Sequence, residues 1–213
     1  MTEAPMTEAR LTEGAVTEAP MTVSAAEASR RRLTVRQVAV VEQLVEAAAD
    51  EARERGYDGI TVRTVARRAG VAPATAYTYF ASKDHLLAEV LWRRMQALPV
   101  PDVDEGATAV ERAIVELRVL GLFMADDPTL AAACTTALLG SGPEVQALRV
   151  LFGATLHERL KAALGDRADE AVLRSLDLAY SGAMLWAGMG HIHFEDVPEA
   201  LADTARLVLG GSP

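Results

Sequence analysis

The chain has 213 residues, of which 50% are hydrophobic and 24% charged, and its formal net charge is -9. This length can bury a sizeable core in one large domain or two small ones, and the composition is globular rather than collagenous or disulfide-rich. A single cysteine, Cys134, excludes an intramolecular disulfide. No apolar run approaches the roughly 20 residues of a membrane span, and the first residues lack the layout of a signal peptide. We therefore expect a soluble cytoplasmic protein, and the net charge taken alone argues against a nucleic-acid partner.

The charge is distributed unevenly along the chain. Residues 1–29 carry five acidic side chains against one arginine. Residues 30–95 carry twelve basic and eight acidic side chains, a balance of +4, whereas residues 96–213 carry eight basic and seventeen acidic ones, a balance of -9. Because a phosphate backbone responds to the local potential and not to the mean, the middle segment is compatible with a nucleic-acid partner.

Residues 1–29 are predicted to form a disordered acidic tail. Thr-Glu pairs recur in this segment every five residues, a spacing that matches neither the helix nor the strand period. The segment also contains two prolines and no aromatic residue. An inert start of the chain and an acidic interaction arm are both compatible with this pattern.

Residues 30–98 are predicted to form the first of two helical domains. Thr34 and Gln37 fit a capping box that opens a long first helix, and Gly56 is suited to end it. Ser82 is the predicted N-cap of a fourth helix that continues to about residue 98. No alternating apolar run of strand length accompanies these helices, so we predict an all-α fold.

Two short helices between these long ones, residues 61–69 and 73–80, have the layout of a helix-turn-helix. Thr61 is the predicted N-cap of the first, and Pro73 suits the first position of the second. Ala76 and Phe80 lie four residues apart and are expected to face inward. Helical proteins that never touch DNA share this layout, but the local positive balance favours DNA.

The segment 99–106 is predicted to separate the two domains, because its two prolines and three acids cannot continue a helix. Residues 99–213 are predicted to hold five more helices, which run from about 107 to 125, 129 to 139, 143 to 164, 168 to 193 and 197 to 209. The predicted organisation is therefore a tail at residues 1–29, a helix-turn-helix domain with a connecting helix at 30–98, and a ligand-binding and dimerisation domain at 99–213.

Three motifs follow one another between Leu44 and Leu87: an alanine pair before Gly-Tyr, TVRTVARRAGV at residues 61–71, and TAYTYFASKDHLL at residues 75–87. Together they resemble the N-terminal domain of TetR/AcrR-type transcriptional regulators. The resemblance covers about a fifth of the chain. It implies a DNA-binding regulator whose helical C-terminal domain binds a ligand and forms a homodimer through its last two long helices. The sequence departs from the family pattern at Ala52, Ala74 and Ala76.

Side chains on the outward faces of the two short helices are the predicted DNA contacts. Hydroxyl and ammonium groups suit phosphate oxygens, and small groups can approach base edges and thymine methyl groups closely. The resemblance places most of these residues at positions that commonly contact operator DNA. The predicted DNA-binding set is Thr61, Arg63, Pro73, Ala74, Thr75, Tyr77, Thr78, Tyr79 and Lys83. The arginines between Arg30 and Arg36 are compatible with a minor-groove arm and, equally, with a solvated basic segment.

Apolar side chains of the second domain are candidates for an effector cavity, although ordinary core positions have the same composition. The predicted ligand-binding set is Phe123, Cys134, Leu138, Phe152, Leu156, Tyr180, Met184 and Trp186. Because the interiors of these helices carry few charges, we expect an apolar, lipid-like or acyl-bearing effector. The final helix offers a stripe of Leu201, Ala205 and Val208 that is suited to a partner.

The leading hypothesis is a homodimeric repressor of a palindromic double-stranded operator that an apolar small molecule releases. No cofactor, metal or membrane partner is expected. His191 and His193 are a poor metal pair on a predicted helix, and no phosphate-binding loop is present. The alternative is a helical small-molecule carrier or an enzyme with a vestigial DNA-binding domain. In that case Cys134 and His157 would be the candidate nucleophile and base.

Overall fold

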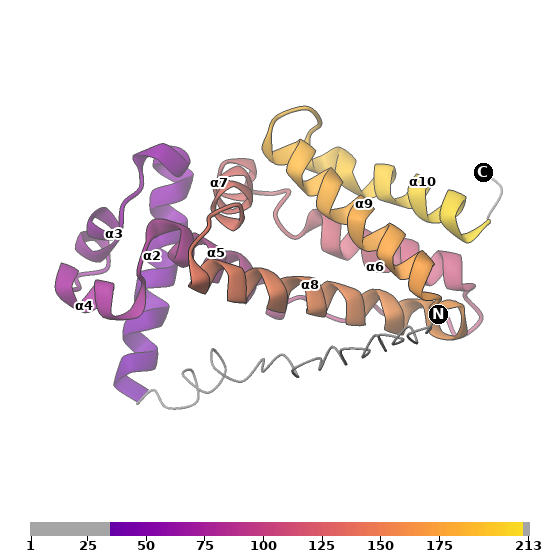
Figure 1. The fold of residues 1–213 in the computed structure, drawn as a ribbon, viewed down its shortest axis with the longest axis horizontal. Helices are drawn as coiled ribbons and strands as arrows, with labels where there is room; N and C mark the ends of the chain where they lie inside the picture. The colour runs from indigo at the N-terminus through magenta and orange to yellow at the C-terminus, as the bar shows by residue number, and fades with distance from the viewer. Residues whose placement is uncertain (1–34, 211–213) are drawn as a thin grey trace, which may run out of the picture.

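The computed structural model describes residues 35–210, and within them all regular secondary structure is helical (Figure 1). The all-α prediction is confirmed. The predicted tail at residues 1–29, the arginines at positions 30–32 and the predicted cap Thr34 lie outside the described residues.

The four helices predicted in the first part of the chain are present. α2 spans Val35–Gly59, and its helical geometry breaks at Gly56, which has a φ of 64° and a ψ of -174°. Glycine adopts a positive φ at little cost, which explains why the helix turns at this residue. The next three helices are α3 (Val62–Arg68), α4 (Pro73–Tyr79) and α5 (Lys83–Gln96).

Five α-helices follow in the second part of the chain, as predicted. They are α6 (Ala109–Leu122), α7 (Pro128–Leu138), α8 (Pro143–Leu164), α9 (Glu170–Gly188) and α10 (Val197–Leu209). Short 3-10 turns at Gly165–Arg167 and Phe194–Asp196 precede the last two.

The predicted end of the fourth of these helices at residue 193 is wrong. α9 ends at Gly188, and Gly190 has a φ of 79°, a conformation that stops a helix. His191 and His193 therefore lie in the loop between α9 and α10. The predicted helical spacing of this pair does not apply.

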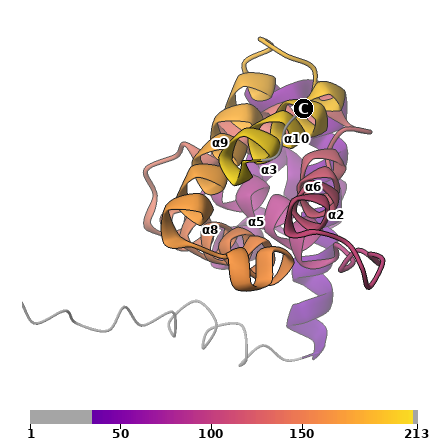
Figure 2. The same ribbon diagram turned by 90° about the vertical axis from the view of Figure 1, so that its right-hand side faces the viewer.

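α2, α3 and α4 form one end of the molecule, and α6, α8, α9 and α10 form a bundle at the other (Figure 1). Each bundle helix packs against its neighbours in the order α6, α8, α9, α10 and back to α6, as the end view in Figure 2 shows. α5 runs from the first group to α8, and α7 packs against α2 and α5 on one side and α9 on the other. One cluster of buried apolar residues runs from α2 to α10, so the two ends share a continuous core.

α10 packs into its own protomer. Leu201 and Ala205 are buried and Val208 is half-buried, and this helix packs mainly against α6. The prediction that this stripe faces a partner is therefore wrong, because an amphipathic pattern does not say which surface covers it. None of the helices within residues 35–210 is long and apolar enough to cross a membrane.

Candidate nucleic-acid interface

α3 begins at a reciprocal cap formed by two threonines. Thr61 Oγ1 accepts the backbone N–H of Thr64 at 3.1 Å, and Thr64 Oγ1 accepts the backbone N–H of Thr61 at 3.0 Å. These bonds satisfy two backbone N–H groups that have no acceptor within the helix because they lie at its start. Val62 and Val65 are buried, whereas Arg63 is exposed. The cap and the buried stripe together fix which face of α3 meets solvent.

A four-residue turn, residues 69–72, joins α3 to α4. Gly70 has a φ of 66°, and its N–H donates to the carbonyl of Arg67 at 3.2 Å. The N–H of Val71 donates to the carbonyl of Ala66 at 2.9 Å. A side chain at position 70 would be strained by the positive φ, so glycine is required there to set the direction of α4.

α4 divides into an inward and an outward face, as predicted. Ala76 is fully buried and Phe80, which follows the helix, is 3% exposed. Tyr77 is 51% exposed, and Thr75 is exposed beside it. Thr78 is also exposed, and its Oγ1 donates to the carbonyl of Ala74 at 3.1 Å. The outward face thus offers a phenol and two hydroxyl groups on a helix that is held by its apolar side. Of the remaining predicted contacts, Thr61, Pro73 and Ala74 are exposed and Tyr79 is half-buried.

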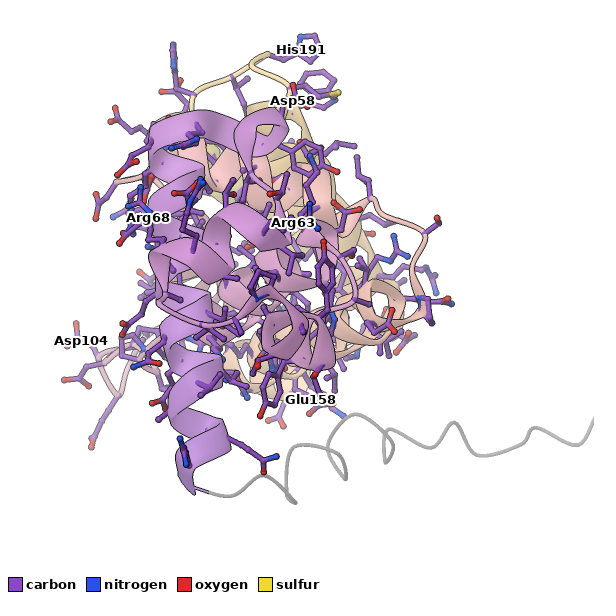
Figure 3. The ribbon with its side chains drawn as sticks, turned by 90° about the vertical axis from the view of Figure 1, so that its left-hand side faces the viewer. Asp58, Arg63, Arg68, Asp104, Glu158 and His191 are labelled. Carbon is purple, nitrogen blue, oxygen red and sulfur yellow. The ribbon has the colours of Figure 1, made fainter. Side chains whose placement is uncertain are left out.

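The arginines of α3 do not share one role. The side chain of Arg68 extends to α2, where its Nε donates to Glu51 at 2.8 Å and its Nη2 pairs with Glu54. These hydrogen bonds to two carboxylates raise the pKa of Arg68. Figure 3 shows Arg68 at the edge of the helix-turn-helix face over α2, and Arg63 nearer its centre. Arg63 is therefore the better placed of the two for DNA.

Lys83 is half-buried, and its ammonium group has a structural contact. Its Nζ donates to the backbone carbonyl of Tyr57 at 2.9 Å and lies 3.8 Å from the centre of the Tyr57 ring. An ammonium group has three donors, so this bond leaves donors for a phosphate. The role of Tyr57 could not be predicted from the sequence, because its contacts are with residues 26 and 27 positions further along the chain.

Seven of the eight predicted ligand residues belong to the apolar core of the protein. Cys134, Leu156 and Tyr180 belong to the main buried cluster, and Phe123, Leu138, Phe152 and Met184 pack against it. The rings of Phe152 and Tyr180 stack with centroids 6.4 Å apart. Trp186 lies elsewhere: it is 58% exposed on α9 and contacts the ring of His191.

An open groove of about 440 Å³ lies between α2 and α5. None of the predicted ligand residues lines it. Its walls carry Arg53 and Arg94, which meet the carboxylate of Asp127 at 2.5 Å and 3.8 Å. This carboxylate also accepts the N–H of Leu130 and so caps α7. Two arginines that line the groove therefore also connect α2 and α5 to the start of α7.

Cys134 and His157, the candidate nucleophile and base, lie in surroundings that do not suit those roles. Cys134 is fully buried on α7, and burial raises the pKa of its thiol to about 12. His157 Nδ1 is bonded to Asp177 at 2.8 Å across α8 and α9. Within residues 35–210, no group of three or more His, Cys, Asp or Glu side chains could hold a metal ion.

Comparison with known proteins places this fold in a family. Residues 44–90 match the family model of bacterial regulatory proteins, tetR family. An uncharacterised HTH-type transcriptional regulator of Mycobacterium tuberculosis is 41% identical over 191 residues, which cover 88% of this chain and 87% of the relative. The chain belongs to the TetR family of transcriptional regulators.

A repressor and a solved structure are also similar to this chain. The transcriptional repressor KstR of Rhodococcus jostii is 30% identical over 165 residues, which cover 75% of this chain and 77% of the repressor. The crystal structure of the regulator FadR from Bacillus subtilis in complex with stearoyl-CoA shares the fold, with a TM-score of 0.55 at 22% identity, and covers 81% of this chain and 99% of FadR.

Proposed function

We propose that this TetR-family regulator is a cytoplasmic homodimeric repressor that reads a palindromic operator with α4 and releases it when an apolar effector binds. The observation that carries the DNA-binding part is the outward face of α4. Its hydroxyl groups are exposed, while buried Ala76 and Phe80 hold the helix from the other side. A helix of this size fits the major groove, and two copies about 34–36 Å apart meet successive grooves.

The proposed contacts divide by chemistry. Pro73, Ala74, Thr75 and Tyr77 are assigned to base edges and thymine methyl groups, because they are small or lie on the exposed face of α4. The phosphate contacts are assigned to Thr61, Arg63, Thr78, Tyr79 and Lys83. Residues 30–98 are the proposed DNA-binding domain with its connecting helix α5, and residues 99–213 the proposed regulatory domain.

The proposed dimer interface is an apolar stripe on α9. Leu178, Trp186 and Met189 are 68%, 58% and 54% exposed. They repeat at helical spacing, with exposed Ser181 and Gly182 between them, so a partner helix can approach closely. Large apolar side chains that are exposed together mark an interaction surface.

The proposed effector site is the part of the apolar core around Phe152 and Tyr180, two of the predicted residues, whose rings stack. A buried tryptophan of α5, Trp92, belongs to a second buried cluster, and two of the predicted residues, Leu138 and Phe152, pack against that cluster. Its Nε1 has no acceptor within residues 35–210. An apolar effector that carries a carbonyl oxygen would supply that acceptor and would touch the helix that leads to the DNA-binding domain. The acyl-CoA bound by FadR motivates the choice of probe.

Selection of bound fragments from genomic DNA, followed by gel shift, tests the DNA-binding part. We expect Thr75→Ala together with Tyr77→Ala to abolish binding of the selected fragment. Thr136→Ala, which alters an exposed threonine of α7 away from this face, is the matched control and should bind like the wild type. Retention of full affinity by the α4 variant would overturn the assignment.

Stearoyl-CoA and coenzyme A test the effector part in the same gel shift. We expect stearoyl-CoA to release the operator and coenzyme A to leave it bound, because only the first carries the acyl chain. The effector proposal fails if a series of acyl chains, up to saturating concentration, leaves the complex intact.

A further inference from the structure

A single tyrosine at the end of α2 holds the first turn of α5. The Tyr57 hydroxyl donates to Asp84 Oδ1 at 2.6 Å. Lys83 donates to the Tyr57 carbonyl and places its ammonium over the same ring, at 2.9 Å and 3.8 Å. Two consecutive residues of α5 therefore clamp one residue of α2. The hydrogen bond to Asp84 raises the pKa of Tyr57 to about 12, with smaller contributions from burial and from the negative charge of Asp84.

This clamp sits directly after the proposed recognition helix. α4 ends at Tyr79, and α5 begins at Lys83. Residues 80–82 between them make contacts of their own. Phe80 is buried, the centroid of its ring lies 5.1 Å from that of His85, and Ser82 caps α5 by accepting the N–H of His85 at 3.0 Å. These contacts join the first turn of α5 to the end of α4.

The same aspartate also meets the other part of the chain. Gly140, in the turn between α7 and α8, lies so close to it that a Cβ on this glycine would be 3.0 Å from Asp84 Oδ2 and 3.2 Å from Asp84 Cβ. The same Cβ would be 3.0 Å from the backbone carbonyl oxygen of Ala137. Gly140 does not have a positive φ. The backbone conformation therefore does not require glycine at this position, whereas the close approach to Asp84 and to the Ala137 carbonyl favours it.

We propose that Tyr57 is a positioning residue for operator binding and that the Gly140–Asp84 contact is where the α7–α8 turn acts on the recognition helix. Movement of this turn toward α5 displaces Asp84, weakens its bond to Tyr57 and changes the orientation of α4. Neither Tyr57 nor Gly140 touches DNA in this account. The inference rests on the proposed function, because it explains how the regulatory part controls operator affinity.

Gly140→Ala imitates the displacement without any effector. A new Cβ at this position would crowd Asp84 and the Ala137 carbonyl, which must shift by a few tenths of an ångström. We expect the operator dissociation constant to rise about tenfold, with a melting temperature close to that of the wild type. Gly142→Ala is the matched control in the same turn, because its Cβ would meet only ordinary contacts at 3.6 Å and 4.0 Å.

Tyr57→Phe keeps the ring beneath Lys83 and removes the bond to Asp84. We expect it to weaken operator binding, and we expect Gly140→Ala to add little to that loss, since both changes act through Asp84. Ultraviolet titration gives a second readout, because the phenol with a pKa of about 12 should be absent in Tyr57→Phe and should titrate at lower pH in Gly140→Ala. A purely structural role of Gly140 would not change this titration.

The outcomes separate this inference from the proposed function. If the wild type binds no DNA fragment, both fail. If the wild type binds and Gly140→Ala and Tyr57→Phe bind equally well, the inference alone is overturned. Independent, multiplicative losses in the double variant would also overturn it, because they would show that the two residues do not act through Asp84.

Discussion

Replacing Arg159 by methionine should destabilise the protein far more than the loss of a surface ion pair would. Arg159 Nε lies 2.5 Å from Oε1 of Glu116, whose side chain is only 5% exposed. Two further nitrogens of Arg159 donate to the carbonyls of Leu98 and Pro99, at the exit of α5. Removing one partner of a buried pair costs about 3–5 kcal/mol, whereas an exposed pair contributes about 0–1 kcal/mol. We expect Arg159→Met to lower the free energy of unfolding by about 3–5 kcal/mol.

The variant Arg159→Met/Glu116→Leu tests the cause of this loss. It removes both charges, so no carboxylate is left buried without a partner, and we expect it to recover at least about 2 kcal/mol relative to Arg159→Met. Urea denaturation at one fixed protein concentration measures both. Arg118→Met changes an exposed arginine on the same helix as Glu116 and should stay within about 0.5 kcal/mol of the wild type. The reasoning is refuted if Arg159→Met loses less than about 1 kcal/mol, or if the loss of the double variant equals the sum of the losses of Arg159→Met and of Glu116→Leu alone.

Three other predictions concern the cap of α3, the buried thiol and the α9 stripe. Thr61→Ala should lower the free energy of unfolding by about 1 kcal/mol in urea, because it removes the cap of α3; an unchanged urea midpoint would contradict the cap. Cys134 keeps its proton in the folded protein, since burial raises its pKa from 9.0 to about 12. Its contribution to stability is therefore complete below pH 9 and is lost as the pH rises toward 12, so the wild type should lose more stability than Cys134→Ala between pH 8 and 11. Leu178→Asp should convert the proposed dimer to a monomer in sedimentation experiments, and an unchanged sedimentation coefficient would exclude this stripe as the interface.

The helix-turn-helix could be predicted from the sequence because its determinants are local. Thr61, Gly70 and Ser82 act on backbone groups within four residues of themselves, and their effects follow from residue type and spacing. The inward direction of Ala76 and Phe80 follows from helical periodicity in the same way.

Contacts between distant segments could not be predicted in this way. The bonds of Lys83 and Arg68 depend on how α2 lies against α3 and α5, and a single sequence contains no signal for that packing. The exposure of Trp186 has the same origin, because α9 is apolar on most faces and the sequence does not say which face the bundle covers. The end of α9 did have a local signal, the glycines at 188 and 190, which the apolar run before them outweighed.

The central claim is that this acidic protein binds DNA through its helix-turn-helix end. The salt dependence of operator binding tests that claim most directly. Each phosphate contact releases counterions, so with 6–10 contacts per dimer the affinity should fall by about 10³–10⁵ between 50 and 200 mM salt. Arg63→Ala should lower the slope of log affinity against log salt by about one for each copy of the arginine that touches phosphate. A steep slope that Arg63→Ala reduces is the predicted result. A flat salt response, or a slope that Arg63→Ala leaves unchanged, would contradict the account.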